Sequence, residues 1–550
     1  MQKLVGDFET TTNKNDVRVW AWCVVDIADA SVQGLDNSME SFFKYINFKN
    51  CALYFHNLKF DGEFILYHLL STGWKHNDTK EPRTFETLIT DTGQFYSITL
   101  YWKKYNKRYV KTAIYDSLKK LPFPVSVIAK AFKLEEGKGE IDYRKDRPPG
   151  YEITKEEREY IVTDCVIVAK ALNEQFAKGL TKMTIGSDAL GGFKKIITKQ
   201  RFEEWYPVFP VTEDSKIRQS YKGGFTYLNP KYKNKRLAGL VFDVNSLYPA
   251  VMYYKPLPYG YPHKYQGEYE LDVIYPLYIQ RLRCEFKLKP GHIPTMQLKN
   301  NPSFIQTDYL KSSGGEIVGL TLTSVDLELF LAHYDVSNLE YLMGWKFKES
   351  RGIFCEYIDY WNDIKARSTG GARELAKLML NNLYGKFATN PKGAKKSPYL
   401  DKDGVVKYKL EDEEERDPVY TAVGAFITAW ARYITITTAQ QNYDRFIYAD
   451  TDSLHLLGYD MPDIEIHDTK LGAWAHEGTF TDSKFLRAKT YMETIDGEEH
   501  ITCAGMPSNV KMDVTYYNFK EGARYTGKLM PKHYEGGIVL EDCDFTIKRG

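Results

Sequence analysis

At residues 448–453 the chain reads Tyr-Ala-Asp-Thr-Asp-Ser, with apolar residues on both sides. An apolar run, an acidic break and a second apolar run predict a strand, a turn and a strand. Carboxylates beside a buried sheet are costly unless a cation or hydrogen-bond donors compensate them, and Mg²⁺ takes one or two carboxylates together with substrate phosphates. Asp450 and Asp452 therefore indicate either a metal–phosphate site or ordinary turn chemistry, and taken alone they favour the turn.

The composition predicts a globular protein of several domains. With 550 residues the chain exceeds the usual size of one hydrophobic core, and 43% apolar and 27% charged residues are typical of globular chains. The net charge of +1 conceals basic stretches, since residues 101–150 carry 13 basic and 6 acidic side chains and residues 170–236 carry 14 and 6. Interleaved aromatic residues predict a surface that follows phosphates, with a solvated lysine face as the alternative.

The cysteines and the apolar runs indicate a location in the cytoplasm. Seven cysteines are widely spaced and form no Cys-x-x-Cys pair, which argues against a disulfide framework or a zinc site and for a reducing compartment. The N-terminus lacks the apolar region of a signal peptide. No run of about 20 apolar residues occurs, so we expect no membrane-spanning segment.

A helix start near residue 154 helps to place the first domain boundary. Thr154 and Glu157 have the spacing of a capping box and follow a Pro-Pro-Gly break. The helix that they open would carry Tyr160 and Asp164 four residues apart, on one face. We expect a first domain to end near residue 184.

The second half of the chain changes composition several times. Residues 255–352 are rich in Pro, Gly and Tyr, which predicts a loop-rich insertion of strands. Residues 353–388 are strongly helical in pattern, and residues 389–414 predict a hairpin with an Asp-Gly turn at 403–404. The tail, 506–550, predicts short strands and turns.

A third carboxylate strengthens the metal hypothesis. Asp243 ends the apolar run at 240–242 and is followed by polar residues and a proline. Alone, it is equally well explained as a strand-end residue that caps the next helix. Together with Asp450 and Asp452 it predicts two strand ends whose carboxylates could bridge two Mg²⁺ ions, as in phosphoryl transfer.

A polar stripe lies on the predicted helix before Gly385. Arg373, Lys377, Asn381 and Tyr384 recur at helical spacing and would share one face. Such a stripe could hold a triphosphate and stack on a base or sugar. The alternative is the solvated face of an amphipathic helix, which is the commoner explanation of a single stripe.

A second set of carboxylates lies in the N-terminal region. Asp7 and Glu9 share a strand face by the period of two. Asp61 and Asp164 come from two other segments, and convergence of all three would give a second two-metal pattern. Tyr160 beside an attacking water would suit hydrolysis. Each carboxylate alone is better explained as a cap or a surface ion pair, but the set favours a nuclease.

Several motifs resemble those of one enzyme family. Asp-x-x-Ser-Leu-Tyr-Pro at 243–249, Lys-x-x-x-Asn-x-x-Tyr-Gly at 377–385 and Tyr-x-Asp-Thr-Asp-Ser at 448–453 resemble, in this order, the three polymerase motifs of family B DNA polymerases. The N-terminal carboxylates resemble the Asp-x-Glu, Asn-x-x-x-Asp and Tyr-x-x-x-Asp motifs of their 3′–5′ proofreading exonuclease. Leu-Lys-Ser-Ser-Gly-Gly-Glu at 310–316 and Ser-Leu-Lys-Lys-Leu-Pro-Phe at 117–123 narrow the resemblance to protein-primed phage polymerases of the phi29 type.

The resemblance spans the whole chain and implies a multidomain α/β and α+β fold. An RNase H-like 3′–5′ exonuclease domain would precede a palm, fingers and thumb polymerase domain with two insertions. The implied divisions are 1–184 exonuclease, 185–254 first part of the palm, 255–352 first insertion and terminal-protein region, 353–388 fingers, 389–414 second insertion for strand displacement, 415–505 second part of the palm, and 506–550 thumb.

The resemblance also implies roles for residues of the polymerase site, which would use two Mg²⁺ or Mn²⁺ ions. The metal ligands would be the carboxylates of Asp243 and Asp452 and the carbonyl of Val244, with Asp450 as support. The nucleotide-binding residues would be Tyr248 (also the gate against ribose), Lys365, Arg373, Lys377, Asn381 and Tyr384. The residues that contact primer or template here would be Tyr221, Lys222, Gly223, Gly224, Thr428, Arg432, Lys489 and Tyr491.

The exonuclease would likewise hold two metal ions. Its ligands would be Asp7, Glu9, Asp61 and Asp164, with Tyr160 and Lys138 assisting hydrolysis. The residues that grip the frayed primer strand would be Thr10, Tyr54, His56, Asn57, Phe60, Phe64, Ser117, Leu118 and Tyr143.

The implied activity is template-directed addition of deoxynucleotides in protein-primed phage replication, with strand displacement, processivity and proofreading. The implied partners are primer–template DNA, dNTPs and a terminal protein that serves as primer, and we expect a monomer in the host cytoplasm. Two positions depart from the family pattern: Asn382 replaces a serine, and Arg373 stands where lysine is usual. The alternatives are a nucleic-acid-primed family B polymerase, a nuclease with a DNA-binding C-terminal region, and a silent replication scaffold.

Overall fold

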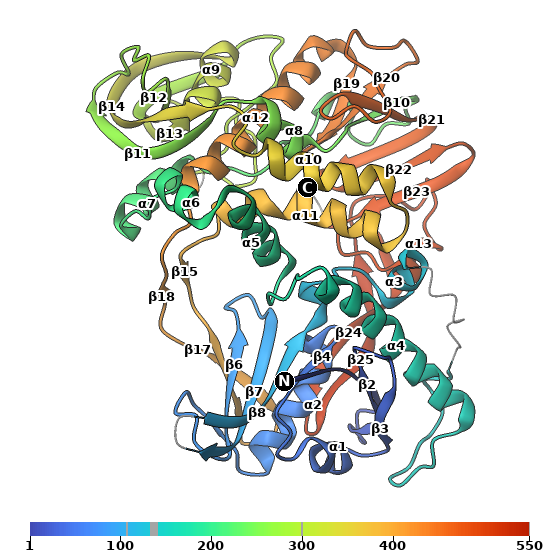
Figure 1. Cartoon of the computed structure of the whole chain (residues 1–550). Coiled ribbons are helices and arrows are strands. Elements are labelled where there is room, and N and C mark those ends of the chain that lie inside the picture. Colours follow the sequence, from blue (N-terminus) through green and yellow to red (C-terminus); the bar gives the residue numbers. More distant parts are fainter. Residues whose placement is uncertain (106–107, 133–140, 299–300, 549–550) are drawn as a thin grey trace.

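The protein was analysed as a computed structural model, which describes residues 1–105, 108–132, 141–298 and 301–548 (Figure 1). Lys138, expected to assist the exonuclease, lies outside the described residues. The described chain is a mixed α/β fold built around two large sheets, one at each end of Figure 1. None of the described helices combines the length and the hydropathy that a membrane span needs. All seven cysteines keep free thiols.

The N-terminal region forms an eight-stranded mixed sheet in the order β3-β2-β1-β4-β8-β7-β6-β5. Its strands are β1 (Gln2–Thr10), β2 (Val19–Asp26), β3 (Val32–Asp36), β4 (Cys51–Phe55), β5 (Lys75–His76), β6 (Thr84–Ile89), β7 (Phe95–Tyr105) and β8 (Arg108–Asp116). β1, β4 and β8 are parallel neighbours. The associated helices are α1 (Met39–Ile46), α2 (Leu58–Ser71), α3 (Val125–Ala131) and α4 (Lys155–Ala177).

Helices α2 and α4 pack on opposite faces of this sheet. The side chains of β1 point alternately toward one face and the other, so they contribute to both cores. Leu4 and Phe8 join the core beneath α2, whereas Val5 joins the core beneath α4. Asp7 and Glu9 have the parity of Val5, so they lie on the α4 face. The capping box predicted at Thr154 is confirmed, and it starts α4 as expected.

The second large sheet has seven strands in the order β23-β22-β21-β10-β20-β19-β9. They are β9 (Thr226–Leu228), β10 (Gly239–Val244), β19 (Phe446–Asp450), β20 (Ser453–Leu457), β21 (Trp474–Arg487), β22 (Thr490–Ile495) and β23 (Glu498–Cys503). Helices α8 (Leu247–Tyr254) and α12 (Thr421–Gln441) pack with it. The strand, turn and strand predicted around residues 450–452 are confirmed as β19 and β20.

Helices between the two sheets form the largest core with the seven-stranded sheet. They are α5 (Ile185–Ile197), α6 (Lys199–Trp205), α7 (Val211–Ile217), α10 (Cys355–Arg367) and α11 (Gly371–Phe387). The rings of Phe193 and Phe354 stack there with centroids 4.7 Å apart. The helical structure predicted for residues 353–388 is thus confirmed, as the two helices α10 and α11.

The insertion of strands predicted at residues 255–352 is confirmed as a separate four-stranded sheet in the order β11-β14-β12-β13. Its elements are β11 (Leu257–Gln266), β12 (Leu277–Leu288), β13 (Val318–Thr323), α9 (Ser324–His333) and β14 (Tyr334–Ser350).

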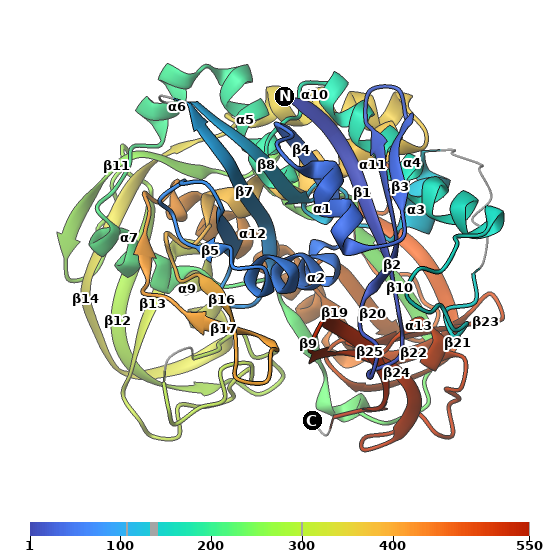
Figure 2. The ribbon, with the colours of Figure 1, turned by 90° about the horizontal axis from the view of Figure 1, so that it is seen from below.

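Two hairpins reach from the upper half of the molecule to the N-terminal sheet (Figures 1 and 2). The predicted hairpin after α11 is confirmed: β16 (Lys396–Leu400) pairs with β17 (Val406–Leu410), and the short pair β15 (Lys392–Gly393) and β18 (Glu414–Glu415) forms its base. Gly404 has φ +71° in its turn. We call residues 392–415 the insertion hairpin.

The prediction of short strands in the tail is wrong. After the short α13 (Ser508–Lys511), β24 (Arg524–Tyr534) and β25 (Gly537–Thr546) form a hairpin with strands of eleven and ten residues. We call it the C-terminal hairpin. Its sequence is charged and lacks an apolar alternation, so its length follows from backbone pairing and the turn at Gly536, where φ is +97°.

Candidate active sites

The three polymerase-like motifs meet at one open hollow of about 590 Å³. Asp243 on β10 pairs with Ser453 on β20, and the amide of Val244 donates a 2.9 Å hydrogen bond to the carbonyl of Asp452. Thr451 takes φ +63° in the turn that carries the carboxylates. The lining residues are Val241, Asp243, Tyr248, Tyr384, Asp450, Thr451, Asp452, Ser453, His455, Lys489, Tyr491 and Glu493.

The carboxylates in this hollow destabilise one another as anions. Burial raises the pKa of Asp243 to about 7, with further contributions from the charges of Asp452 and Glu477. Burial also raises the pKa of Asp452, and the charge of Asp450 adds to it. A divalent cation would relieve this repulsion. In the described part of the chain, no group of three acidic, histidine or cysteine side chains is placed to hold a metal ion.

Asp450 differs from Asp452 in its surroundings. The ammonium of Lys489 lies 2.7 and 2.8 Å from the two carboxylate oxygens of Asp450. The Thr226 hydroxyl donates a 2.8 Å hydrogen bond to one of them, and the Tyr448 hydroxyl lies 3.3 Å from the other. Asp450 is therefore held by donors of the protein, whereas the negative charge of Asp452 acts on the carboxyl group of Asp243.

Cations from α10 and α11 gather beside the hollow. Burial lowers the pKa of Lys365, and the charges of Arg373 and Lys377 lower it further, so the three cations lie close together. Lys365 donates a 3.1 Å hydrogen bond to the Ser246 hydroxyl, and Arg373 donates one of 2.9 Å to the Lys365 carbonyl. Such a cluster suits a polyphosphate.

Two tyrosines connect this cluster to the carboxylates. The rings of Tyr248 and Tyr384 stack with centroids 4.0 Å apart at 23°. Asn381 is exposed on α11, one turn before Tyr384. At the departure from the family pattern, the Asn382 amide donates a 2.8 Å hydrogen bond to the Leu378 carbonyl, so this side chain is used within its own helix.

The segment 221–224 is held from beneath by a buried arginine. Arg432 is 3% exposed, forms a bidentate ion pair with Asp326, and donates hydrogen bonds of 2.8 and 2.7 Å to the carbonyls of Lys222 and Gly223. At Gly224 a Cβ atom would lie 2.5 Å from the Thr451 hydroxyl, so only glycine fits against the catalytic turn.

Direct DNA contact by Arg432 and Thr428 is not supported by their positions. Thr428 is 1% exposed, and its hydroxyl donates to the carbonyls of Gly424 and Ala425 in the same helix. Arg432 is placed to act on DNA through the segment that it holds, and direct contact by either side chain stays a prediction.

The second set of predicted carboxylates converges around β1 of the N-terminal sheet. Burial raises the pKa of Asp61 well above its usual value, and the charges of Asp7 and Glu9 contribute. Burial also raises the pKa of Tyr160, followed by the effects of its hydrogen bond to Tyr143 and of the Asp164 charge. Three segments therefore place their acidic side chains around one region, as the sequence predicts.

The residues expected to grip a primer strand divide by exposure. Tyr54, Phe64 and Ser117 are buried, and Tyr54 packs its ring against Tyr115 and Phe176. Both ring nitrogens of His56 are occupied, at 3.0 Å from the Ser117 hydroxyl and 2.8 Å from the Phe123 carbonyl. The side chains that are at least partly exposed are Thr10, Asn57, Phe60, Leu118 and Tyr143.

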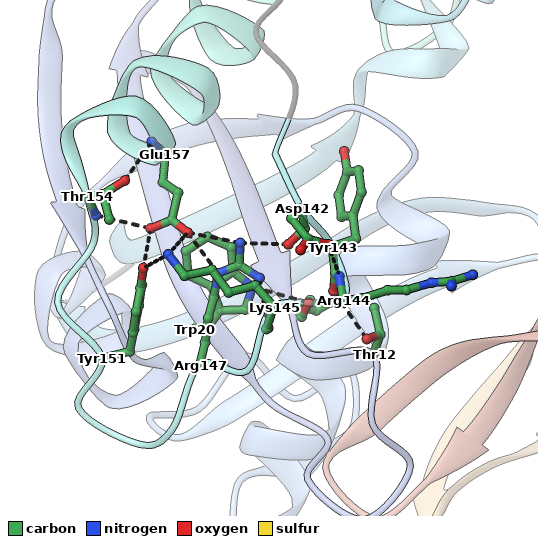
Figure 3. A network of polar contacts seen from close by, with 11 residues as sticks. Thr12, Trp20, Asp142, Tyr143, Arg144, Lys145, Arg147, Tyr151, Thr154 and Glu157 are labelled. Carbon is green, nitrogen blue, oxygen red and sulfur yellow. Dashed lines mark hydrogen bonds and ion pairs between the residues drawn. The ribbon is translucent and has the colours of Figure 1, made fainter.

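No pattern in the sequence indicates a buried network that supports this site (Figure 3). Arg147 is 3% exposed, lies 4.1 Å above the Trp20 ring and donates a 3.0 Å hydrogen bond to Glu157. It also donates to the carbonyls of Asp142 and Lys145. Glu157 belongs to the capping box of α4, so the arginine joins the loop 141–151 to the helix that carries Tyr160.

The loop 141–151 also contributes Tyr143, whose hydroxyl contacts that of Tyr160. Tyr143 and Tyr160 place their hydroxyls 2.6 Å apart, and the backbone carbonyl of Tyr143 accepts a 3.2 Å hydrogen bond from Thr12. Displacement of the loop would therefore move a hydroxyl that lies beside Glu9 and Asp164.

Substitution Arg147→Lys is expected to lower exonuclease kcat about tenfold or more, because lysine cannot hold both carbonyls and Glu157 in one plane and small displacements at a reacting centre are costly. Nucleotide addition should stay unchanged. Arg144→Lys, the same substitution at an exposed position three residues earlier, is the control. Equal exonuclease rates in the two variants would contradict the assignment.

Comparison with known proteins shows the family to which the chain belongs. The family described as DNA polymerase type B, organellar and viral, matches residues 44–471. The chain is 50% identical to the DNA polymerases of Bacillus phages B103 and phi29, over 98% of its length and 99% and 98% of theirs. It is 35% identical to the DNA polymerase of Streptococcus phage Cp-1, over 99% of this chain and 98% of that one.

The fold likeness is equally extensive. The structure of phi29 DNA polymerase complexed with primer–template DNA and incoming nucleotide substrates has a TM-score of 0.97 at 49% identity, with 100% of both chains covered. The phi29 polymerase complexed with single-stranded DNA has a TM-score of 0.95. The chain belongs to the type B DNA polymerases of organelles and viruses, in the phage group that includes the enzymes of phi29 and B103.

Proposed function

We propose that this protein is a DNA-directed DNA polymerase of protein-primed phage replication, with strand displacement and a 3′–5′ proofreading exonuclease. The observation that carries the proposal is the single hollow that joins Asp243 and Asp452 to the Tyr248–Tyr384 stack. Whole-length identity to phage DNA polymerases supports the same assignment.

The polymerase reaction is attack of a primer hydroxyl on the α-phosphate of a deoxynucleotide, with pyrophosphate as the leaving group. Asp243, Asp452 and the Val244 carbonyl would hold two Mg²⁺ or Mn²⁺ ions, which supply Lewis-acid stabilisation of charge when bound. Lys489 neutralises Asp450 and so fixes the turn in which Asp452 projects toward Asp243. In this proposal Asp452 is a metal ligand, and Asp450 keeps the turn in place without binding the metal.

The incoming nucleotide would lie between the helices and the sheet. Lys365, Arg373 and Lys377 bind the triphosphate, and Asn381 lies on the same face of α11. Tyr384 packs on the nascent base pair, and Tyr248 beneath it leaves no room for a ribose 2′-hydroxyl. Tyr491 and Lys489 border the place of the primer end, while Tyr221 to Gly224 hold the template.

The N-terminal carboxylates would carry the opposite reaction, hydrolysis of the primer end. Asp7, Glu9, Asp61 and Asp164 provide the ligands for two further divalent ions. Tyr160, held by Tyr143, orients the attacking water, and the exposed members of the primer-gripping set bind the frayed strand.

The proposed function also assigns a role to each domain of the chain. Residues 1–184 are the RNase H-like exonuclease, the seven-stranded sheet is the palm, α10 and α11 are the fingers, and residues 506–550 are the thumb. The four-stranded sheet at 255–352 would dock the terminal protein. A monomer acting in the host cytoplasm is consistent with free thiols and with phage relatives.

The decisive experiment is deoxyadenylylation. The protein is incubated with labelled dATP, a divalent cation, terminal DNA and each candidate terminal protein, and covalent label on the terminal protein is the expected result. Extension of a DNA primer without any such label would indicate a nucleic-acid-primed polymerase. Degradation without incorporation would indicate a nuclease with a DNA-binding C-terminal region.

Deletion of residues 392–414 is expected to leave short gap filling intact and to abolish displacement synthesis, because the insertion hairpin stands between α11 and the N-terminal sheet. The lengths of gap-filling and rolling-circle products measure the two activities in one preparation. Rolling-circle products of unchanged length would refute this role for the hairpin.

A further inference from the structure

A carboxylate is buried where three distant segments meet. Glu63 on α2 is 3% exposed. Its Oε1 accepts a 2.7 Å hydrogen bond from the Tyr408 hydroxyl on the insertion hairpin, and its Oε2 lies 3.5 Å from Nδ1 of His533 on the C-terminal hairpin. Burial raises the pKa of Tyr408, and the negative charge of Glu63 raises it further. Oε2 accepts no hydrogen bond from the described residues, so Tyr408 and His533 are the groups that offset the burial of this carboxylate when both hairpins are docked.

The apolar surroundings of Glu63 also come from all three segments. Val406 and Ile538, one from each hairpin, are buried in the same core as Phe64 of α2. The Tyr408 ring packs edge-on against Phe95, with centroids 6.1 Å apart. At Gly537 a Cβ atom would lie 2.5 Å from the Phe64 ring, so the C-terminal hairpin presses directly on α2.

The tips of the two hairpins touch each other beside this core. Val405 and Glu535 form an isolated antiparallel bridge, and the Tyr67 hydroxyl of α2 lies 3.5 Å from the Glu535 carboxylate. Figure 2 shows the insertion hairpin beside α2, with the C-terminal hairpin on the far side of that helix. The contact closes a continuous connection from the fingers through the N-terminal domain to the C-terminal end.

The base of the insertion hairpin borders a basic passage. Thr90 of the N-terminal domain bridges to Lys395, and a cavity of about 860 Å³ lies between this region and α11. The cations that line it are Lys119, Lys386, Lys392, Lys395 and Arg416. Lys392, Lys395 and Arg416 form ion pairs there with Glu414 or Glu415, so the positive charge of this cavity is partly neutralised. The hairpin is therefore fixed to the N-terminal domain at both ends, with the passage at one end and Glu63 at the other.

We propose that Glu63 is a positioning residue that clasps the insertion hairpin and the C-terminal hairpin on α2, and that this clasp sets how many nucleotides are added per binding event. The inference rests on the proposed polymerase function. It assigns to the N-terminal domain a part in retaining DNA that is separate from hydrolysis, since Glu63 contacts the two hairpins, whereas Asp61 on the same helix lies near Asp7 and Glu9.

The test uses Glu63→Gln and Tyr408→Phe in the full-length protein. Product length is measured on a primed single-stranded circle in the presence of a DNA trap that captures dissociated enzyme. Loss of a hydrogen bond to a charged group shifts the closed–open ratio about tenfold, so products should shorten severalfold. Single-nucleotide addition on a short primer and degradation of single strands should keep their wild-type rates.

Tyr101→Phe is the matched control, because Tyr101 donates a 3.1 Å hydrogen bond to Glu86 within the N-terminal sheet and joins no other domain. Products of wild-type length in both clasp variants would overturn the proposal. Equal losses in single-nucleotide addition and in product length would also overturn it, since they would mark Glu63 as a folding residue.

A disulfide between the tips of the two hairpins distinguishes loss of the clasp from a general folding defect. Val405→Cys with Glu535→Cys is introduced into the Glu63→Gln variant and oxidised after the protein has bound DNA, because bridge partners on antiparallel strands have the spacing of a disulfide. Oxidised protein should regain wild-type product length, and reduced protein should not. No recovery on verified cross-linking would contradict the proposal.

Amide hydrogen exchange tests the clasp without any polymerase assay. In the free protein, amides of residues 396–410 should exchange faster in Glu63→Gln than in Tyr101→Phe. Faster exchange without nucleotide addition by the wild type would leave the clasp standing and refute the polymerase function. Unchanged exchange with normal synthesis would refute the clasp alone.

Discussion

Asp452→Asn is expected to lower nucleotide addition about a thousandfold while degradation of single strands keeps its wild-type rate. Asparagine has the same shape as aspartate, so the β19–β20 turn should fold normally. It removes a charge that raises the pKa of Asp243 across the hollow, and with it several kcal/mol of charge stabilisation in the reaction.

The measurement is single-turnover incorporation on a short primer–template, with exonuclease assayed on the same preparation. Asp460→Asn is the control, because Asp460 is exposed and lies eight positions further along the chain, beyond β20. Equal loss of both activities in Asp452→Asn would contradict two separate sites. Retained incorporation would remove Asp452 from the metal site.

The sequence predicts the local elements well because their signals are local. An acidic break between apolar runs specifies β19 and β20, and the Thr154 capping box starts α4, since both depend on residues a few positions apart. The sequence also indicates which carboxylates lie near one another, because strand ends and helix faces determine where Asp243 and Asp164 project, while their roles stay predictions.

Burial of individual polar residues could not be predicted in the same way. Arg432 resembles a DNA-contacting residue on its helix, but it is enclosed by Asp326 and the 222–223 backbone, which are far away in sequence. His56 likewise uses both nitrogens within the protein. Whether a polar side chain faces solvent depends on tertiary contacts that one sequence does not reveal.

The same limit explains why two buried supports had no sequence signal. Arg147 stacks on Trp20, and Glu63 meets Tyr408 across more than three hundred positions of the chain. Neither pair has a spacing that could be recognised. Both become visible only because a buried charge must have its partners nearby, so burial together with polarity is the structural signal for them.

Asp7→Ala combined with Glu9→Ala is expected to lower exonuclease activity about a thousandfold and to leave correct nucleotide addition at its wild-type rate. Both carboxylates lie on the α4 face of β1, where their charges contribute to the raised pKa of Asp61. Their removal should therefore return the Asp61 pKa toward its usual range while eliminating two oxygen ligands. A primer with a mismatched end should then persist or be extended uncorrected.

Asp36→Ala with Glu40→Ala removes two exposed carboxylates from the same domain and is the control. If the Asp7 and Glu9 variant still trims mismatched ends at the control's rate, the hydrolytic site lies elsewhere; if it also loses nucleotide addition, the two carboxylate sets are not independent.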